Sequence, residues 1–156
     1  RKIDIDDQEW RLGSFFTSGA DRIIPGKGGS TGTTSGLLKF LLALEKGEVV
    51  NARSSLELKR LMYVTDRRIR YSAARAIRDD AVYFKSGSYY SFHEGSKRVQ
   101  YAGTKFNYMN SVAIVEKQDD TKKKYLVALM SNVLGKNSVN EHYRLAAQID
   151  EVIQHL

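Results

Sequence analysis

The chain has 156 residues, 42% of them hydrophobic and 28% charged, a composition that fits one globular domain and argues against global disorder. It contains no cysteine, which excludes a disulfide scaffold and a thiolate metal site, and the sequence predicts no metal and no cofactor. Its formal charge of +7 would suit an anionic cell-wall polymer. No helix-turn-helix pattern or aromatic single-strand platform accompanies that charge, so we expect no nucleic-acid partner.

Residues 1–35 are weakly patterned and predict a loop-rich opening segment, in which Trp10 is a candidate for packing. The glycine-rich stretch 26–34 lacks Gly-Lys-Ser/Thr at the spacing of a phosphate-binding loop, so it is interpreted as a connector. No signal peptide and no run of ~18 apolar residues is present, so no membrane span is expected in this segment. The polar start, Arg1–Glu9, is typical of a piece of a longer precursor or an excised fragment.

Residues 36–80 predict a helical part. A first helix begins where Thr33, Thr34 or Ser35 can accept hydrogen bonds from its free amides, and its leucines recur at helical spacing until Gly47. A second helix is predicted from Ser54, which forms a capping box with Glu57 and precedes a buried stripe of Leu58, Leu61 and Met62. From residue 65 to 80 the charge density rises and periodicity fades, which predicts a surface connection with about one helical turn.

Residues 81–156 predict a three-stranded meander and a terminal helix. The expected strands are Ala81–Phe84, Asn110–Lys117 and Lys124–Ser131, the last two joined by a polar turn over 118–121, while 86–105 suits a loop or irregular hairpin. Ser138 and Glu141 suggest a capping box opening a helix to the C-terminus. The apolar stripe expected on that helix is Leu145, Ile149, Val152 and Leu156, with Ala146 and Ile153 alongside.

The segment Tyr125–Met130 is apolar at both alternating positions, which indicates a strand covered on both faces. Such a strand is also expected to be central in its sheet, because exposed apolar edges invite aggregation. Its natural neighbour within the chain, Asn110–Lys117, fills one side only. We therefore expect a partner segment to fill the other side.

The residues that indicate chemistry are Lys85-Ser86-Gly87, at the end of the predicted strand Ala81–Phe84 and followed by Ser88-Tyr89-Tyr90. A lysine, a hydroxyl and a glycine at a strand end can form an anion-binding, oxyanion-stabilising edge. The same tripeptide type is the third sequence motif of penicillin-binding proteins and class A β-lactamases.

With this order of helices, strands and motif, the chain from about residue 23 onward resembles the C-terminal part of serine β-lactamases and the related D-alanyl-D-alanine peptidases. The resemblance implies an α/β fold in which an antiparallel sheet is flanked by helices beside a helical lobe. It makes 1–156 a single incomplete domain whose first strands and nucleophile helix come from an N-terminal half, possibly a separate chain. It also implies a β-lactam or peptidoglycan stem peptide as substrate, and a periplasmic or secreted location.

The resemblance assigns roles to residues of the motif. Lys85 would place a positive charge near the substrate carboxylate and the active-site hydroxyls, and the Ser86 hydroxyl would hydrogen-bond that carboxylate. Gly87, lacking a Cβ, would let an acyl substrate lie against the strand edge, and the Ser88 N–H would be half of an oxyanion hole. The side chains of Tyr89 and Tyr90 would line the substrate site.

The chain departs from the family in its nucleophile. No serine is followed three residues later by lysine, and Thr121-x-x-Lys124 has that spacing only in a turn. A Ser/Tyr-x-Asn match, Tyr108-Met109-Asn110, follows Lys85-Ser86-Gly87 instead of preceding it and is treated as accidental. Two functions stay open: the C-terminal part of a serine hydrolase whose nucleophile lies on a preceding segment, and a catalytically inactive β-lactamase-like binding or scaffold protein.

Three further residue groups have no chemical assignment. The histidines His93, His142 and His155 have no metal-binding spacing and are expected at the surface. Asp79-Asp80 is expected to be a pair of solvated loop carboxylates. An unrelated basic binding domain is a third and weaker hypothesis.

Overall fold

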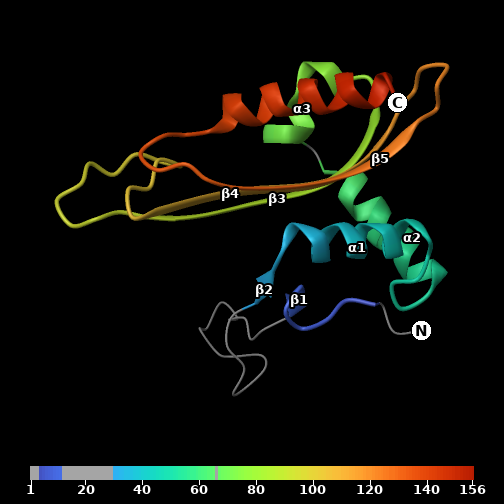
Figure 1. The fold of residues 1–156 in the computed structure, drawn as a ribbon, viewed down its shortest axis with the longest axis horizontal. Helices are drawn as coiled ribbons and strands as arrows, with labels where there is room; N and C mark the ends of the chain where they lie inside the picture. Colours follow the sequence, from blue (N-terminus) through green and yellow to red (C-terminus); the bar gives the residue numbers. More distant parts are fainter. Residues whose placement is uncertain (1–3, 12–29, 66) are drawn as a thin grey trace.

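The computed structural model describes residues 4–11, 30–65 and 67–156. These residues form a mixed α/β structure in which an antiparallel sheet lies between two helical layers (Figure 1). The elements in chain order are β1 (Trp10–Arg11), β2 (Thr31–Gly32), α1 (Thr34–Glu45), α2 (Ala52–Tyr63), η1 (Arg70–Ala73), η2 (Arg75–Ile77), β3 (Ala81–Ser91), β4 (Phe106–Glu116), β5 (Lys124–Asn132) and α3 (Val139–Gln154). Residues 26–29 of the predicted connector lie outside the described residues.

The first helix begins as its sequence predicts. The Thr33 side chain accepts a hydrogen bond from the Gly36 amide at 3.0 Å and caps α1. The capping box predicted for the second helix is wrong, because Asn51 is the N-cap of α2 and accepts from the Ser54 amide at 2.8 Å. The box predicted at Ser138 is also wrong: that residue is the N-cap of α3, but its hydroxyl contacts the sulfur of Met109.

The sheet has the order β3-β4-β5, with both pairs antiparallel. The predicted strand Ala81–Phe84 is too short, since β3 continues to Ser91 and pairs with β4 over its whole length. Residues 92–105 form the loop, so Lys85-Ser86-Gly87 lies inside the strand and not at its end. The long β3–β4 hairpin projects beyond the helices at one end of the molecule (Figure 1).

The register determines which backbone groups of the outer strands are unpaired. The Lys117 amide donates to the Lys123 carbonyl at 2.8 Å, just outside the facing pair Glu116 and Lys124. In an antiparallel ladder this bond marks Glu116 and Lys124 as a non-hydrogen-bonded pair, so even-numbered residues of β4 direct their N–H and C=O groups to β3. Continued through the register, even-numbered residues of β3 and β5 direct these groups to the two outer edges of the described sheet.

Both faces of the sheet are covered, as the apolar strand Tyr125–Met130 predicted. One face packs against α1 and α2 through a cluster that includes Leu41, Leu44 and Met62. The other packs against α3, η1 and η2 through a cluster that includes Tyr71 and Ala146. The prediction of a surface connection over 65–80 is therefore wrong, because residues 67–80 contribute Tyr71 and Ile77, both fully buried, to the core.

The stripe predicted for the terminal helix is rotated from the buried face. Ala146, Ile149 and Ile153 pack against the sheet, whereas Leu145 and Val152 are exposed. Two polar side chains, His142 and Asp150, lie on the buried face of α3, so the surface prediction for His142 is wrong.

Asp80, predicted to be solvated, is buried in an ion cluster at the end of the sheet. Lys117 Nζ lies 2.8 Å from Asp80 Oδ2 and 3.1 Å from Asp150 Oδ1. The Tyr125 hydroxyl donates to Asp150 at 2.9 Å. Burial by itself would lower the pKa of Lys117, but its hydrogen bonds to Asp80 and Asp150 raise it above the usual value.

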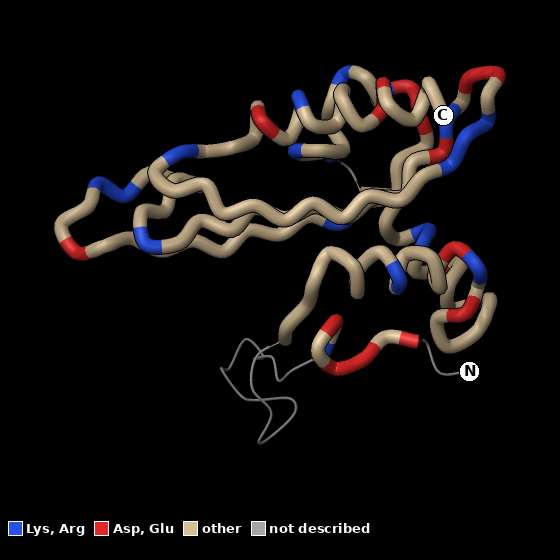
Figure 2. The backbone as a smooth tube through the Cα atoms, viewed as in Figure 1, with Lys and Arg blue, Asp and Glu red and all other residues tan. Residues whose placement is uncertain are grey.

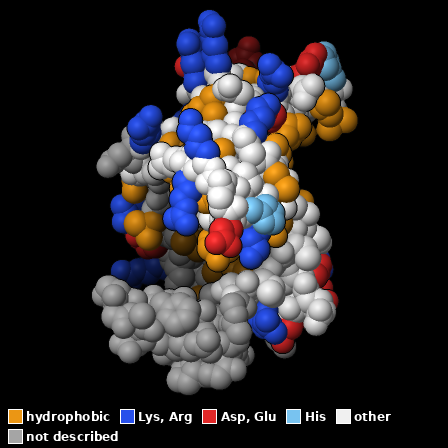
Figure 3. Space-filling model, turned by 90° about the vertical axis from the view of Figure 1, so that its left-hand side faces the viewer, with side chains coloured by type: hydrophobic (Ala, Val, Ile, Leu, Met, Phe, Trp, Pro, Cys, Tyr) orange, Lys and Arg blue, Asp and Glu red, His pale blue; other side chains and the backbone are white. Residues whose placement is uncertain are grey.

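Charged residues are sparse along the middle of the strands and gather at the strand ends and loops (Figure 2). The end that carries the β3–β4 loop shows Lys and Arg side chains in excess over Asp and Glu (Figure 3). That loop contains Lys97, Arg98 and Lys105 against Glu94 alone. Among the described residues no helix has the length and apolar character needed to cross a membrane.

Candidate functional site at the outer edge of β3

Strand alternation separates the six predicted site residues into two groups. The odd-numbered positions lie on the side of the sheet covered by α1 and α2. They are Lys85, Gly87 and Tyr89, which pair with Val112, Asn110 and Tyr108 of β4, respectively. The side chains of Ser86, Ser88 and Tyr90 therefore point to the side of α3 and η1. The structure brings Lys85 and Gly87 together on one face and places the two hydroxyls on the other.

The backbone of β3 joins the two groups at the edge. Because even-numbered residues direct their peptide groups outward, the amides of Ser86, Ser88 and Tyr90 face the open side of the described sheet. Ser88 is exposed, and a Cβ built on Gly87 would meet no atom within 4 Å. A ligand backbone can therefore approach this edge and accept hydrogen bonds from it.

Lys85 supplies positive charge at the same edge. Its ammonium group is exposed and donates to the Ser86 carbonyl, which also faces outward, at 2.6 Å. Lys85 also lines a cavity of about 370 Å³ between α1, α2 and the sheet. Leu37 and Phe40 of α1 and Leu61 of α2 contribute to the cavity wall, and Lys85 is the one charged residue among the described residues that line it.

The two tyrosines of the predicted site have different surroundings. Tyr89 is 69% exposed and stacks on Phe106, with ring centroids 4.9 Å apart. Phe106 stacks in turn on Tyr108 at 5.7 Å, so these rings form a ladder on the projecting hairpin. Tyr90 lies on the opposite face and packs edge-on against Tyr101 at 5.6 Å.

Arg70 is a residue of this region that sequence reasoning missed. Its Nη1 donates to the Gly87 carbonyl oxygen at 2.8 Å, and its guanidinium lies 5.5 Å from the Tyr101 ring centroid. Burial lowers the pKa of Arg70. In sequence it is one arginine in an arginine-dense segment, and no local pattern distinguishes it from the solvated ones.

The family-like motifs outside β3 are not assembled into a nucleophile site. The Thr121 hydroxyl bonds to the Asp119 carboxylate inside the β4–β5 turn. Asn110 is the neighbour of Gly87 on β4, but its side chain accepts from the Ser131 amide at 3.3 Å, on the β5 side. In the described part of the chain, no group of three or more His, Asp or Glu side chains could hold a metal ion.

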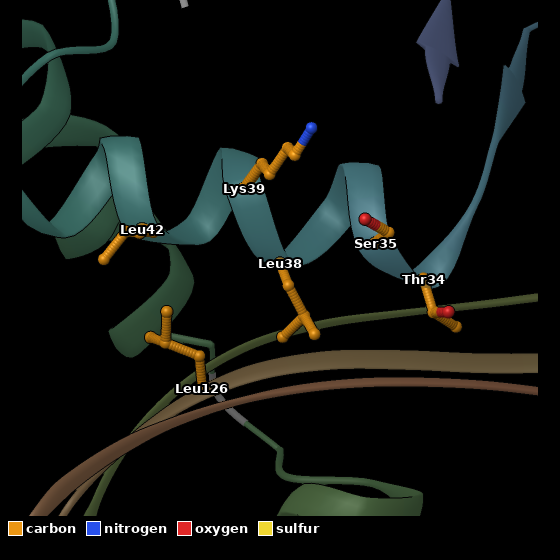
Figure 4. A pocket seen from close by; sticks show the side chains of 6 residues that line it. All are labelled: Thr34, Ser35, Leu38, Lys39, Leu42 and Leu126. Atoms are coloured by element: carbon orange, nitrogen blue, oxygen red, sulfur yellow. The ribbon is translucent and has the colours of Figure 1, made fainter. Parts of the chain in front are cut away.

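The opposite edge of the sheet has a different character. Leu38 and Leu42 of α1 point toward Leu126 of β5 around an open, mainly apolar cavity of about 500 Å³ (Figure 4). Leu42 is 44% exposed and Met130 of β5 is 37% exposed. The outward peptide groups of β5 have no neighbouring strand within the described sheet.

Comparison with known proteins adds no identification: no family model, no curated protein and no solved structure matches this chain.

Proposed function

We propose that this chain supplies the anion- and carbonyl-binding edge of a β-lactamase-like serine hydrolase. Its substrates would be β-lactams or peptidoglycan stem peptides outside the cytoplasm. The observation that carries the proposal is the composition of one sheet edge, where the Lys85 ammonium, the open Gly87 and the outward Ser88 amide lie together. In this reaction a serine hydroxyl on another segment attacks the substrate carbonyl carbon, the amide C–N bond breaks, and water later releases the acyl group.

Each residue of the edge has a defined role in that reaction. The Ser88 N–H donates to the oxyanion that forms on the carbonyl, and loss of such a donor typically lowers the rate by about 10²–10³-fold. Lys85 attracts the substrate carboxylate and favours deprotonation of nearby hydroxyls. The absent side chain of Gly87 leaves room for the substrate beside the strand.

The nucleophile segment and a further strand complete the proposed enzyme. The apolar β5 edge, bordered by Leu38 and Leu42, supports a strand partner from the N-terminal half of the same protein or from a separate chain. An unprotected edge of this length and apolarity is rarely left open in a native sheet.

The test is acylation by a fluorescent penicillin of the protein as its source organism makes it. We expect one labelled serine, mapped by peptide mass spectrometry to a Ser-x-x-Lys sequence outside residues 1–156. Lys85→Ala should reduce labelling by orders of magnitude, whereas Lys105→Ala, at an exposed lysine that ends the β3–β4 loop, should not. Equal labelling of the Lys85→Ala protein would remove Lys85 from the site.

A catalytically inactive binding or scaffold protein is the second candidate. It is favoured by the absence of Ser-x-x-Lys from the 156 residues and by the hydrogen bond that Lys85 already makes to the Ser86 carbonyl. In that case the natural protein would remain unlabelled by penicillin while still binding a stem peptide, which isothermal titration calorimetry would detect.

A further inference from the structure

Arg70 occupies a conformation that arginine seldom adopts. Its φ is +53°, in the left-handed region that favours glycine, although its side chain is long and the residue is only 7% exposed. Among the described residues, no carboxylate forms an ion pair with it. A buried, strained and unpaired cation is costly, so its contact with β3 needs a compensating role.

The contact is with one particular peptide group. The carbonyl of Gly87 and the amide of Ser88 belong to the same peptide unit and point in opposite directions along the hydrogen-bonding axis of the sheet. The register directs Gly87 C=O toward β4, where it faces the amide of Asn110, and directs Ser88 N–H to the open edge. Arg70 Nη1 adds a second, charged donor to that carbonyl at 2.8 Å.

A charged donor on a carbonyl oxygen draws electron density from the whole peptide unit. The amide proton at the other end becomes more positive, and the plane of the unit is held between two donors and the strand. We propose that Arg70 is a positioning residue that polarises and orients the Ser88 N–H as an anion donor. This inference rests on the proposed function, which assigns that amide to the oxyanion hole.

The experiment uses the isotopically labelled chain in solution NMR, with inorganic phosphate as the anion probe. Arg70→Asn removes the guanidinium and retains a side chain that tolerates positive φ, while Arg70→Lys retains the charge. Arg68→Asn is the matched control, because the Arg68 guanidinium also donates to backbone carbonyls, those of Ile77, Arg78 and Asp80, all of which precede β3.

We expect the Ser88 amide proton to move upfield in Arg70→Asn, to move less in Arg70→Lys and to stay in place in Arg68→Asn. Phosphate should shift the Ser88 resonance of the unmodified chain, with severalfold weaker affinity in Arg70→Asn. A purely structural Arg70 would alter stability without this selective change. Ser88 resonances that coincide in the unmodified chain and Arg70→Asn would overturn the inference.

The outcome separates the two proposals. If phosphate leaves Ser88 unmoved in the unmodified chain, the anion-binding edge fails, yet the resonance comparison without phosphate still decides the role of Arg70. If Arg70→Asn does not fold, the carbonyl ¹³C resonance of Gly87 in the unmodified chain decides it. That resonance should lie downfield of the Tyr89 carbonyl after correction for residue type, and an equal position would contradict the second donor.

Discussion

Replacing Lys117 with methionine tests the buried ion cluster that joins α3 to the end of the sheet. Lys117 contacts Asp80 at 2.8 Å and Asp150 at 3.1 Å, and the three side chains are 6%, 8% and 10% exposed. Removal of the ammonium leaves two carboxylates buried without a counter-charge. Removing one partner of a buried pair costs about 3–5 kcal/mol, a large share of the ~5–15 kcal/mol that stabilises a typical domain.

The assay is urea unfolding followed by far-ultraviolet circular dichroism, repeated at several protein concentrations to separate unfolding from self-association. A second variant that combines Lys117→Met with Asp80→Asn and Asp150→Asn should recover much of the loss, because it removes the charges with their partner. Arg60→Ala, which breaks the exposed pair with Glu57, is the control and should change little. A loss below about 1 kcal/mol for Lys117→Met would refute the assignment of a tightly buried cluster.

Three further predictions follow from other contacts. His142 is buried with Nε2 3.0 Å from Ser131 Oγ, and burial lowers the pKa of this histidine. The unfolded chain therefore binds a proton first as the pH falls, so the free energy of unfolding should decrease below about pH 6.5. His142→Gln should remove this dependence of stability on pH, and an unchanged dependence in the variant would contradict the assignment. Because the Ala128 amide faces outward, Ala128→Pro should leave the β4–β5 ladder intact and reduce self-association measured by ultracentrifugation. Leu129→Pro should instead unfold the chain, and equal effects of the two substitutions would refute the register argument. Gly87→Ala should keep the melting temperature of the chain while lowering penicillin acylation of the natural protein. Gly103→Ala is the contrasting variant and should destabilise the chain, because the new Cβ at position 103 would lie 2.2 Å from the Phe106 carbonyl oxygen. A large loss of stability in Gly87→Ala would show that the edge is not open.

Local signals explain which parts of the fold could be predicted. The start of α1 depends on a capping threonine and the β4–β5 hairpin on a polar turn, and each of these signals can be recognised within a few residues of sequence. The length of β3 could not be predicted in this way, because residues 86–91 contain glycine and hydroxyl residues of modest strand preference and are held by their pairing with β4. Such pairing joins residues that are distant in sequence, so no short stretch of sequence indicates it.

The rotated stripe of α3 has a different cause. Apolar periodicity favours a face that includes Leu145 and Val152, but the buried face carries His142 and Asp150. Both polar side chains have partners on the sheet: Nε2 of His142 contacts Ser131, and the Asp150 carboxylate contacts Lys117 and Tyr125. A pattern that counts only apolar residues assigns such positions to solvent. The role of Arg70 could not be predicted either, because its partner is a backbone carbonyl that is distant in sequence.

The two outer edges of the sheet differ in a way that separates their partners. Along β3 the outward peptide groups are accompanied by Lys85, two serines and an open glycine, so the edge is polar, charged and accessible. Along β5 the same kind of peptide groups lie among Leu38, Leu126 and other apolar side chains. A small anionic acyl ligand gains most at the first edge through charge and amide donors, whereas an apolar strand gains most at the second through buried area. Because the edges lie on opposite sides of β4, both partners can bind at once, and strand addition at β5 need not obstruct the edge at which Arg70 holds the Ser88 peptide.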